Sequence, residues 1–232
     1  MRKFGKKYVE ASKKVEKNTL YSATDAVKLV KETNVTKFDS TIDIAIKLNV
    51  DPKKADQMLR GSLVLPNGSG KSKKILVLAK GAAAAEAKEA GADFVGDTDL
   101  IDKIANENWF DYDTIVATPE MMPALGKIGK VLGPKGLMPN PKTGTVTTTP
   151  AKTVTDIKKG MVEYRADSLG NVHGIIGKVS FDEKALSENL TYFINTIIKS
   201  KPTTIKGKFV KSISICTTMG PGIKIDLNSF DK

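Results

Sequence analysis

The spacing of apolar residues changes twice along the chain, and no other sequence feature limits the fold as strongly. Between residues 42 and 50 apolar and polar side chains alternate, which is typical of a strand with one buried face. Residues 74–117 instead contain short apolar runs separated by helical stretches, which is typical of βαβ units. Alternation returns after Gly160. The two flanks therefore share one pattern and the middle has another.

This arrangement predicts an α/β chain with two lobes. Residues 1–66 and 160–232 are expected to form one discontinuous α+β domain with an antiparallel sheet. Residues 67–159 are expected to form an inserted α/β domain with a parallel sheet. Because two glycine-containing connections would join the lobes, we also expect a hinge between them.

The expected elements follow from the same patterns. A helix near 23–34 should begin after Ser22, which with Asp25 has the spacing of a capping box. The inserted lobe should contain strands at 74–78, 93–95 and 114–117 and helices at 82–90 and 98–106. The second flank should contain strands at 163–166, 172–179, 209–218 and 223–227 and a helix at 182–199.

The charge is positive and unevenly distributed. The net charge is +11, yet residues 81–113 carry nine acidic and two basic residues. Three basic clusters, at 1–20, 126–142 and 199–211, lie outside this acidic segment. Such a distribution favours a protein that binds a polyanion, most simply a nucleic acid. Only three arginines are present, so the lysines are expected to neutralise phosphates and bidentate base reading should be minor.

Several classes of protein are disfavoured. The single cysteine, Cys216, and the single histidine, His173, cannot supply an internal disulfide or a zinc site. The N-terminal sequence has no apolar run of a signal peptide, and no segment approaches about 20 apolar residues. We therefore expect a cytoplasmic protein without metal, cofactor or membrane contact.

Neither nucleotide binding nor catalysis has a motif. Gly68–Ser72 resembles the end of a phosphate loop, but Leu65 stands at its first glycine and a strand follows. The turn at 78–82 lacks the Gly-x-Gly-x-x-Gly of dinucleotide sites. No nucleophile, base and orienting group can be assembled, so no catalytic residue and no enzyme is predicted. A nucleotide-using enzyme and a duplex-DNA binder remain the alternatives, although no recognition helix is found.

Three segments allow two interpretations each. Residues 126–142 combine glycines, prolines and lysines, which predicts an ordered basic segment that binds RNA or a partner, or a plain surface loop. Residues 217–222 are either a hairpin turn or a place where a nucleic-acid backbone approaches closely. Phe38, beside Lys37, either stacks on a base or belongs to the core.

Taken together, these segments resemble those of one family. The motifs are Leu65-Pro66-Asn67-Gly68-Ser69-Gly70-Lys71, Leu132-Gly133-Pro134-Lys135-Gly136-Leu137-Met138-Pro139, and Lys201-Pro202 followed by Thr217-Thr218-Met219-Gly220. Their order and identity resemble the large-subunit ribosomal protein L-one family, of bacterial type, over essentially the whole chain.

The resemblance implies a terminal lobe that binds ribosomal RNA and an inserted lobe of Rossmann-like topology without a dinucleotide. Its implied place is the mobile stalk of the large subunit, beside the tRNA exit site. The implied partners are stalk ribosomal RNA, outgoing exit-site tRNA and the chain's own operon messenger, whose translation it would repress through a mimic of the ribosomal site. The free protein is expected to be a monomer.

The resemblance also implies which residues touch RNA. The residues that match the family's RNA surface are Lys37, Phe38, Thr41, Ser212, Thr218, Met219, Gly220 and Pro221, with His173 as a weaker candidate. They would meet if the strands that begin near Thr41 and end near Thr218 are neighbours. Hydroxyls would bond sugars, Gly220 would permit close approach, and apolar side chains would pack on riboses or bases.

Overall fold

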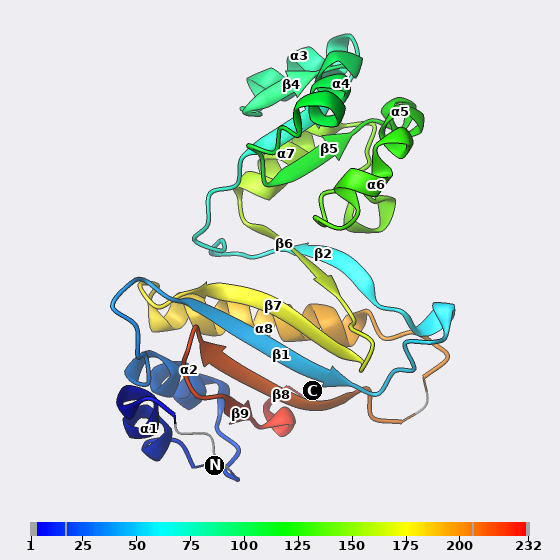
Figure 1. The fold of residues 1–232 in the computed structure, drawn as a ribbon. Coiled ribbons are helices and arrows are strands. Elements are labelled where there is room, and N and C mark those ends of the chain that lie inside the picture. Colours follow the sequence, from blue (N-terminus) through cyan, green and yellow to red (C-terminus); the bar gives the residue numbers. More distant parts are fainter. Residues whose placement is uncertain (1–3, 17, 206, 231–232) are drawn as a thin grey trace. The chain divides into compact units, whose positions relative to one another are not determined.

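The computed structural model describes residues 4–16, 18–205 and 207–230, and the chain forms two compact units. Unit 1 comprises Met1–Gly70 and Val162–Lys232, and unit 2 comprises Lys71–Met161. An antiparallel sheet in unit 1 and a parallel sheet in unit 2 confirm the mixed α/β class. Figure 1 shows the helices and strands of both units, coloured by position in the sequence from blue to red.

Unit 1 contains a four-stranded sheet in the order β7-β1-β8-β9. Its strands are β1 (Thr41–Leu48), β7 (Asn171–Lys178), β8 (Val210–Thr217) and β9 (Ile223–Ile225). Each neighbouring pair is antiparallel. Along β1 the side chains alternate strictly between buried and half-buried, as the sequence pattern predicted.

Helices cover the apolar face of this sheet. They are α2 (Ala23–Glu32), which contacts β8 and β9, and α8 (Glu183–Lys199), which contacts β7, and the two helices contact each other. Helix α1 (Lys6–Lys13) precedes them in the chain. The side chain of Ser22 accepts a hydrogen bond from the N–H of Asp25, which confirms the predicted start of α2. Phe193 of α8 is fully buried, and a Cβ at Gly174 would come within 2.5 Å of its ring. Gly174 therefore lets the helix approach β7.

A second, two-stranded sheet pairs β2 (Arg60–Val64) with β6 (Met161–Arg165). The sequence patterns did not predict β2, because it is short and its partner lies about 100 residues further along the chain. A Cβ at Gly61 would lie 2.7 Å from the Tyr164 hydroxyl, so the glycine marks close packing between the two strands.

Unit 2 contains a parallel sheet in the order β4-β3-β5. Its strands are β3 (Ile75–Leu78), β4 (Phe94–Gly96) and β5 (Thr114–Ala117). Its helices are α3 (Ala82–Glu89), α4 (Thr98–Glu107), α5 (Met122–Lys127), α6 (Gly129–Leu132) and α7 (Pro150–Lys158). Short 3₁₀ turns complete the chain at Ala55–Gln57, Pro119–Met121, Pro141–Thr143 and Leu227–Ser229.

The two faces of the parallel sheet pack against different helices. Leu76, Leu78, Ile115 and Ala117 join the core cluster that includes residues of α4 and α5. Helices α3 and α7 contact each other, α3 contacts β3, and α7 contacts β5. Because strand residues alternate in direction, buried Val116 points to the α3–α7 side.

A buried amide anchors the chain at the end of unit 1's first segment. Asn189 on α8 is fully buried, and its Oδ1 accepts a hydrogen bond from the N–H of Asn67 at 3.1 Å. Its Nδ2 donates to the carbonyls of Gly68 at 3.0 Å and Ile176 at 2.8 Å. The Pro66–Gly70 turn is thereby fixed to both α8 and β7.

Candidate nucleic-acid interface

The start of β1 and the end of β8 lie side by side. Ile42 pairs with Thr217, and the N–H and the hydroxyl of Thr218 donate to the carbonyl of Thr41 at 3.0 and 3.3 Å. The two strands are thus neighbours, and the segments before β1 and after β8 meet at one end of these inner strands, which we call the β1–β8 edge. Thr41 and Thr218 are both half-buried, so parts of their side chains reach solvent.

The turn after β8 is strained. Met219 has a φ of +68°, and the residue is 75% exposed. A non-glycine residue in this region is unfavourable by about 1 kcal/mol or more, and such strain is concentrated at functional sites. The N–H of Gly220 donates to the carbonyl of Thr217, and a Cβ at Gly220 would come within 2.2 Å of the Thr217 hydroxyl. Glycine is therefore needed for this turn.

Phe38 precedes β1 on the same edge. It is 60% exposed and does not belong to the core, and Lys37 beside it is also exposed. Two large apolar side chains, Phe38 and Met219, are thus presented to solvent close to the hydroxyls of Thr41 and Thr218. Pro221, in contrast, is buried, so its ring supports the turn.

The remaining predicted residues lie elsewhere on the sheet. Ser212 is exposed, but it pairs with Lys47 at the opposite end of β8, roughly 20 Å along the strand from Thr218. His173 lies on the outer strand β7, pairs with Ala45 midway along β1, and is exposed. Both point away from the helices, because their β1 partners are on the half-buried face. The structure therefore spreads the predicted set along one open face.

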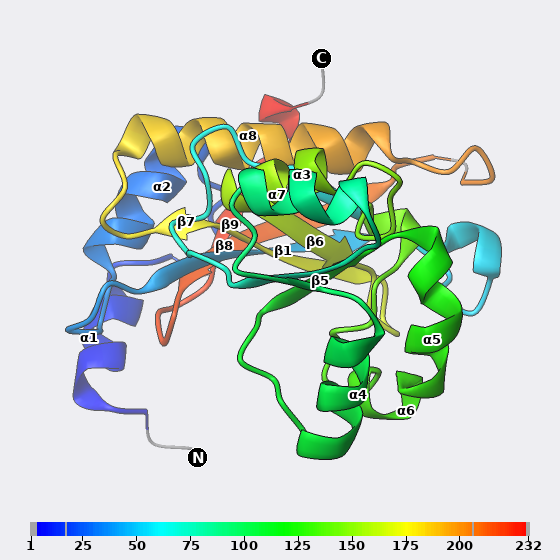
Figure 2. The ribbon, with the colours of Figure 1, turned by 90° about the horizontal axis from the view of Figure 1, so that it is seen from above.

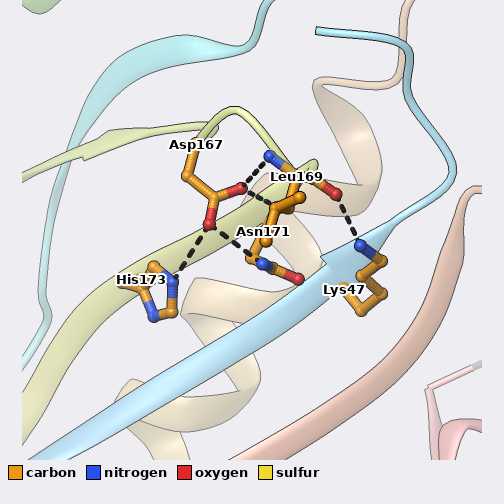
Figure 3. A network of polar contacts seen from close by, with 5 residues as sticks. All are labelled: Lys47, Asp167, Leu169, Asn171 and His173. Carbon is orange, nitrogen blue, oxygen red and sulfur yellow. Dashed lines mark hydrogen bonds and ion pairs between the residues drawn. The ribbon is translucent and has the colours of Figure 1, made fainter.

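An additional polar network, which sequence patterns did not reveal, lies near His173 (Figure 3). The carboxylate of Asp167 accepts hydrogen bonds from the N–H of Leu169 at 2.9 Å and from the N–H and side-chain amide of Asn171 at 2.7 and 2.9 Å. His173 Nε2 lies 3.7 Å from the same carboxylate, and Lys47 donates to the carbonyl of Leu169. The network orders the turn before β7.

These contacts favour the ionised form of Asp167. The N–H and then the amide of Asn171 lower the pKa of Asp167 from 3.8 to about 2. A depressed native pKa stabilises the fold above pH 4, and this stabilisation is lost as the pH falls from about 4 to about 2. We expect Asp167→Asn to lose less stability than the wild type between pH 5 and pH 2 in urea unfolding.

The control for this pH prediction is Asp182→Asn, since exposed Asp182 makes no side-chain cap at the start of α8. This variant should follow the wild-type pH dependence. If Asp167→Asn followed it as well, the hydrogen bonds of Asp167 would not contribute to the acid sensitivity of the fold.

A shallow groove of about 520 Å³ runs over the open face of the sheet. Its lining includes Asp43, Glu163, His173 and Cys216. Burial raises the pKa of the Asp43 carboxyl, while His173 lowers it, and burial together with Asp43 raises the pKa of the Cys216 thiol. The thiol is thus kept protonated and unreactive. Carboxylates here would accept hydrogen bonds from sugar hydroxyls or base amino groups and would repel phosphates.

The basic clusters lie outside this groove. In unit 1 the exposed lysines include Lys6, Lys7, Lys14, Lys201 and Lys208, while Arg2, Lys3, Lys17 and Lys206 lie outside the described residues. Among the described residues, no group of three or more histidines, cysteines and carboxylates could hold a metal ion. No helix in the described part of the chain has the length and apolar character of a membrane span.

The basic segment of unit 2 is ordered and partly helical. Residues 126–142 contain the end of α5, all of α6 and part of a 3₁₀ turn. Leu137 and Met138 pack on the core of unit 2, and Lys135 Nζ lies 3.5 Å from the ring centroid of Phe110. Lys127, Lys130 and Lys142 are exposed, and the first two follow Gly126 and Gly129, beside which a Cβ would meet nothing within 4 Å. The segment is thus ordered and basic, as the first of its two interpretations expects, and its contact with RNA or a partner stays a prediction.

One comparison with known proteins bears on these sites. The family model described as "Ribosomal protein L1p/L10e family" matches residues 30–221. The match therefore covers most of the chain, including the start of β1, the end of β8 and the whole inserted unit.

Proposed function

Since the chain belongs to the ribosomal protein L1p/L10e family, we propose that the edge formed by β1 and β8 binds the RNA of the mobile stalk. Membership makes the chain a large-subunit ribosomal protein that binds ribosomal RNA in the cytoplasm. The family is one of structural RNA-binding proteins. The observation that carries the proposal is the exposure of two large apolar side chains at the joined strand ends: Met219, at positive φ after β8, and Phe38, three residues before β1.

The chemistry of this edge fits RNA better than DNA. Phe38 and Met219 would pack on bases or riboses, while the hydroxyls of Thr41 and Thr218 would bond to 2′-hydroxyls. The acidic groove keeps phosphates away from the middle of the sheet, so the phosphate backbone would follow the lysine-rich margins. Lys37 stands at such a margin. The proposed recognition therefore depends on shape and sugars more than on base edges.

We further propose that unit 2 meets exit-site tRNA and assists its release. The support is the positive charge of four exposed lysines, Lys127, Lys130, Lys135 and Lys142, on one short segment, together with the open space at its glycines. In this proposal each unit is a separately folding domain, unit 1 holds the stalk and unit 2 is presented to the tRNA.

Repression of the chain's own operon messenger is proposed to use the same edge. A messenger segment that reproduces the shape of the stalk site would compete for Phe38, Thr218 and Met219. The two RNAs should therefore exclude each other, because one surface cannot hold both at once.

The proposal is tested by a salt-titrated binding assay of the full chain. We expect tight binding to a stalk RNA fragment and weak binding to a scrambled RNA of equal length, with a ratio that persists as salt rises. Specific contacts survive screening, whereas phosphate neutralisation by lysines does not. Equal and steeply salt-dependent binding to both RNAs would contradict specific recognition.

Two competitors separate the finer proposals. An RNA from the chain's own operon leader should displace the stalk fragment, and failure to do so would remove the repression proposal alone. Deacylated tRNA should bind to the preformed stalk RNA complex, and this binding should weaken when Lys127 and Lys130 are both replaced by alanine. Unchanged tRNA binding would remove unit 2 from the tRNA contact.

A further inference from the structure

Helices α3 and α7 lie beside each other with their N-terminal ends at the same edge of the parallel sheet. Helix α3 follows β3, and α7 follows a segment that pairs with β5. In this pairing the N–H of Ala117 donates to the carbonyl of Thr145 at 2.9 Å, and the N–H of Thr147 donates to the carbonyl of Ala117 at 3.1 Å. The C-terminal ends meet, because Lys158 at the end of α7 donates to the carbonyl of Gly91 after α3. The two helices have eight and nine residues and contact each other (Figure 2), and both begin at the carboxyl edge of the parallel sheet.

The two pairs of helix ends differ in charge. The C-terminal ends carry Lys88 and Lys158, which compensate the negative ends of the helix dipoles. The first turns of α3 and α7 contain no acidic residue, and neither N-cap makes a side-chain hydrogen bond. Lys80 adds a further positive charge directly before α3. This corner of the described unit therefore combines two uncapped N-termini with a lysine.

A buried hydroxyl in the same corner has no partner. Thr118 follows β5, is 8% exposed, and its N–H donates to the carbonyl of Leu78 at 3.1 Å. Its Oγ1 has no hydrogen-bond partner among the described residues. Thr118 is extended and two residues after Val116, so its side chain points to the α3–α7 side. Buried hydroxyls are normally paired, so this one is free to donate to a ligand.

The carboxylate of Asp97 forms an ion pair with Lys80. Asp97 follows β4, and its Oδ2 lies 3.7 Å from Lys80 Nζ. Its Oδ1 is buried and has no hydrogen-bond partner among the described residues. In doubly wound α/β folds, ribose hydroxyls bind an acidic residue at the end of the second strand, about 20 residues after the turn that follows the first strand. Asp97 at the end of β4 has this place relative to β3.

We propose that this edge of unit 2 binds one ribonucleotide. Its phosphate lies at the N-termini of α3 and α7, where Lys80 and the Thr118 hydroxyl contact it, and its ribose hydroxyls donate to Asp97. The turn before α3 has one glycine, Gly81 at φ +59°, with open space beside it, which suits a single phosphate and not a pyrophosphate. The ribonucleotide is either free or part of an RNA strand. This site does not depend on stalk RNA binding by unit 1.

The test titrates the full-length chain with 5′-AMP, hexa-adenylate RNA, adenosine and inorganic phosphate, with detection by amide NMR. We expect 5′-AMP or the oligonucleotide to shift the signals of Gly81, Ala82 and Thr118. Tighter binding of 5′-AMP assigns the free nucleotide, and tighter binding of the oligonucleotide assigns an RNA strand. The proposal is overturned if neither 5′-AMP nor the oligonucleotide shifts these signals. It is also overturned if inorganic phosphate binds as tightly as 5′-AMP, since the site would then hold an adventitious ion only.

Two matched pairs of variants locate the site. Lys80→Ala should weaken nucleotide binding at least about tenfold, because a charge-assisted contact is lost, while Lys88→Ala at the other end of α3 should leave it unchanged. Thr118→Val should weaken binding about fivefold without lowering the melting temperature, because it removes a hydroxyl that has no partner in the protein. Thr114→Val, at the other end of β5, is its control.

Equal effects of the two members of either pair would overturn the site. Stalk RNA binding is measured with the same variants and should stay within about twofold of wild type, since they lie in unit 2 and not at the β1–β8 edge. A failure of stalk recognition in the wild type would affect the proposed function and leave this site standing.

Discussion

Met219→Asp should lower the affinity for stalk RNA about a hundredfold while the fold remains intact. The substitution replaces an apolar side chain, expected to be buried against RNA, with a charge that repels phosphates, and these effects together amount to about 3 kcal/mol. Because Met219 is 75% exposed in the free protein, the substitution disturbs no core packing. Binding is measured at two salt concentrations and folding by far-UV circular dichroism.

Two further variants show whether position matters. Met58→Asp introduces the same charge at another exposed methionine of unit 1 and should change RNA affinity less than about threefold. Met219→Gly relieves the positive φ, so it should raise the free energy of unfolding by about 1 kcal/mol and still weaken RNA binding. RNA affinity that survives both changes at Met219 would remove this residue from the interface.

Gly220→Val tests the turn itself. A Cβ at this position would collide with the Thr217 hydroxyl, so the turn must move and carry Met219 with it. We expect a loss of RNA affinity similar to that of Met219→Asp. Gly222→Ala is the matched control, since a Cβ there meets nothing within 4 Å. Equal affinities for the two glycine variants would contradict the close approach at Gly220.

Asn189→Leu should lower the free energy of unfolding of unit 1 by about 3 kcal/mol. The substitution leaves the N–H of Asn67 and the carbonyls of Gly68 and Ile176 without their partner. Each buried polar group that loses its hydrogen bond lowers the free energy of unfolding by about 1–3 kcal/mol. Asn195→Ala, an exposed asparagine on the same helix, should change the free energy by less than about 0.5 kcal/mol.

The chain provides an internal reporter for this experiment. Trp109 is the only tryptophan of the sequence and belongs to unit 2, so its fluorescence follows unit 2, whereas circular dichroism follows both units. Asn189→Leu should shift the part of the urea transition that only circular dichroism detects. If the fluorescence transition moved equally, the amide would stabilise the whole chain and not unit 1 alone.

Periodicity predicted the elements whose residues fill one buried face. The alternation of β1, the capping box of α2 and the apolar stripe of α8 each encode their structure locally, and each is present. The strand β2 and the helices between residues 122 and 158 were not predicted. Their apolar residues are few and interrupted by glycine or proline, so tertiary packing and the first-turn position of Pro150 decide them.

For the candidate interface, sequence indicated residue types but not neighbours. Thr41 and Thr218 are 177 residues apart, and only the pairing of β1 with β8 places them together. The exposure of Phe38 and the burial of Pro221 likewise depend on packing that no local pattern records. The Asp167 network was missed because its hydrogen bonds come from a turn with no recognisable motif. The assignment of these residues to RNA contact stays a prediction.

The central position of β1 has a consequence for synthesis. Both of its sheet neighbours, β7 and β8, come from the last third of the chain, whereas all strands of unit 2 lie between β1 and β7 in sequence. During translation unit 2 can therefore fold completely while β1 still has two unpaired edges, which attract other strands. A nascent chain would need protection at β1 until its C-terminal segment leaves the ribosome, and ribosome stalling before Val210 should leave β1 accessible to proteases.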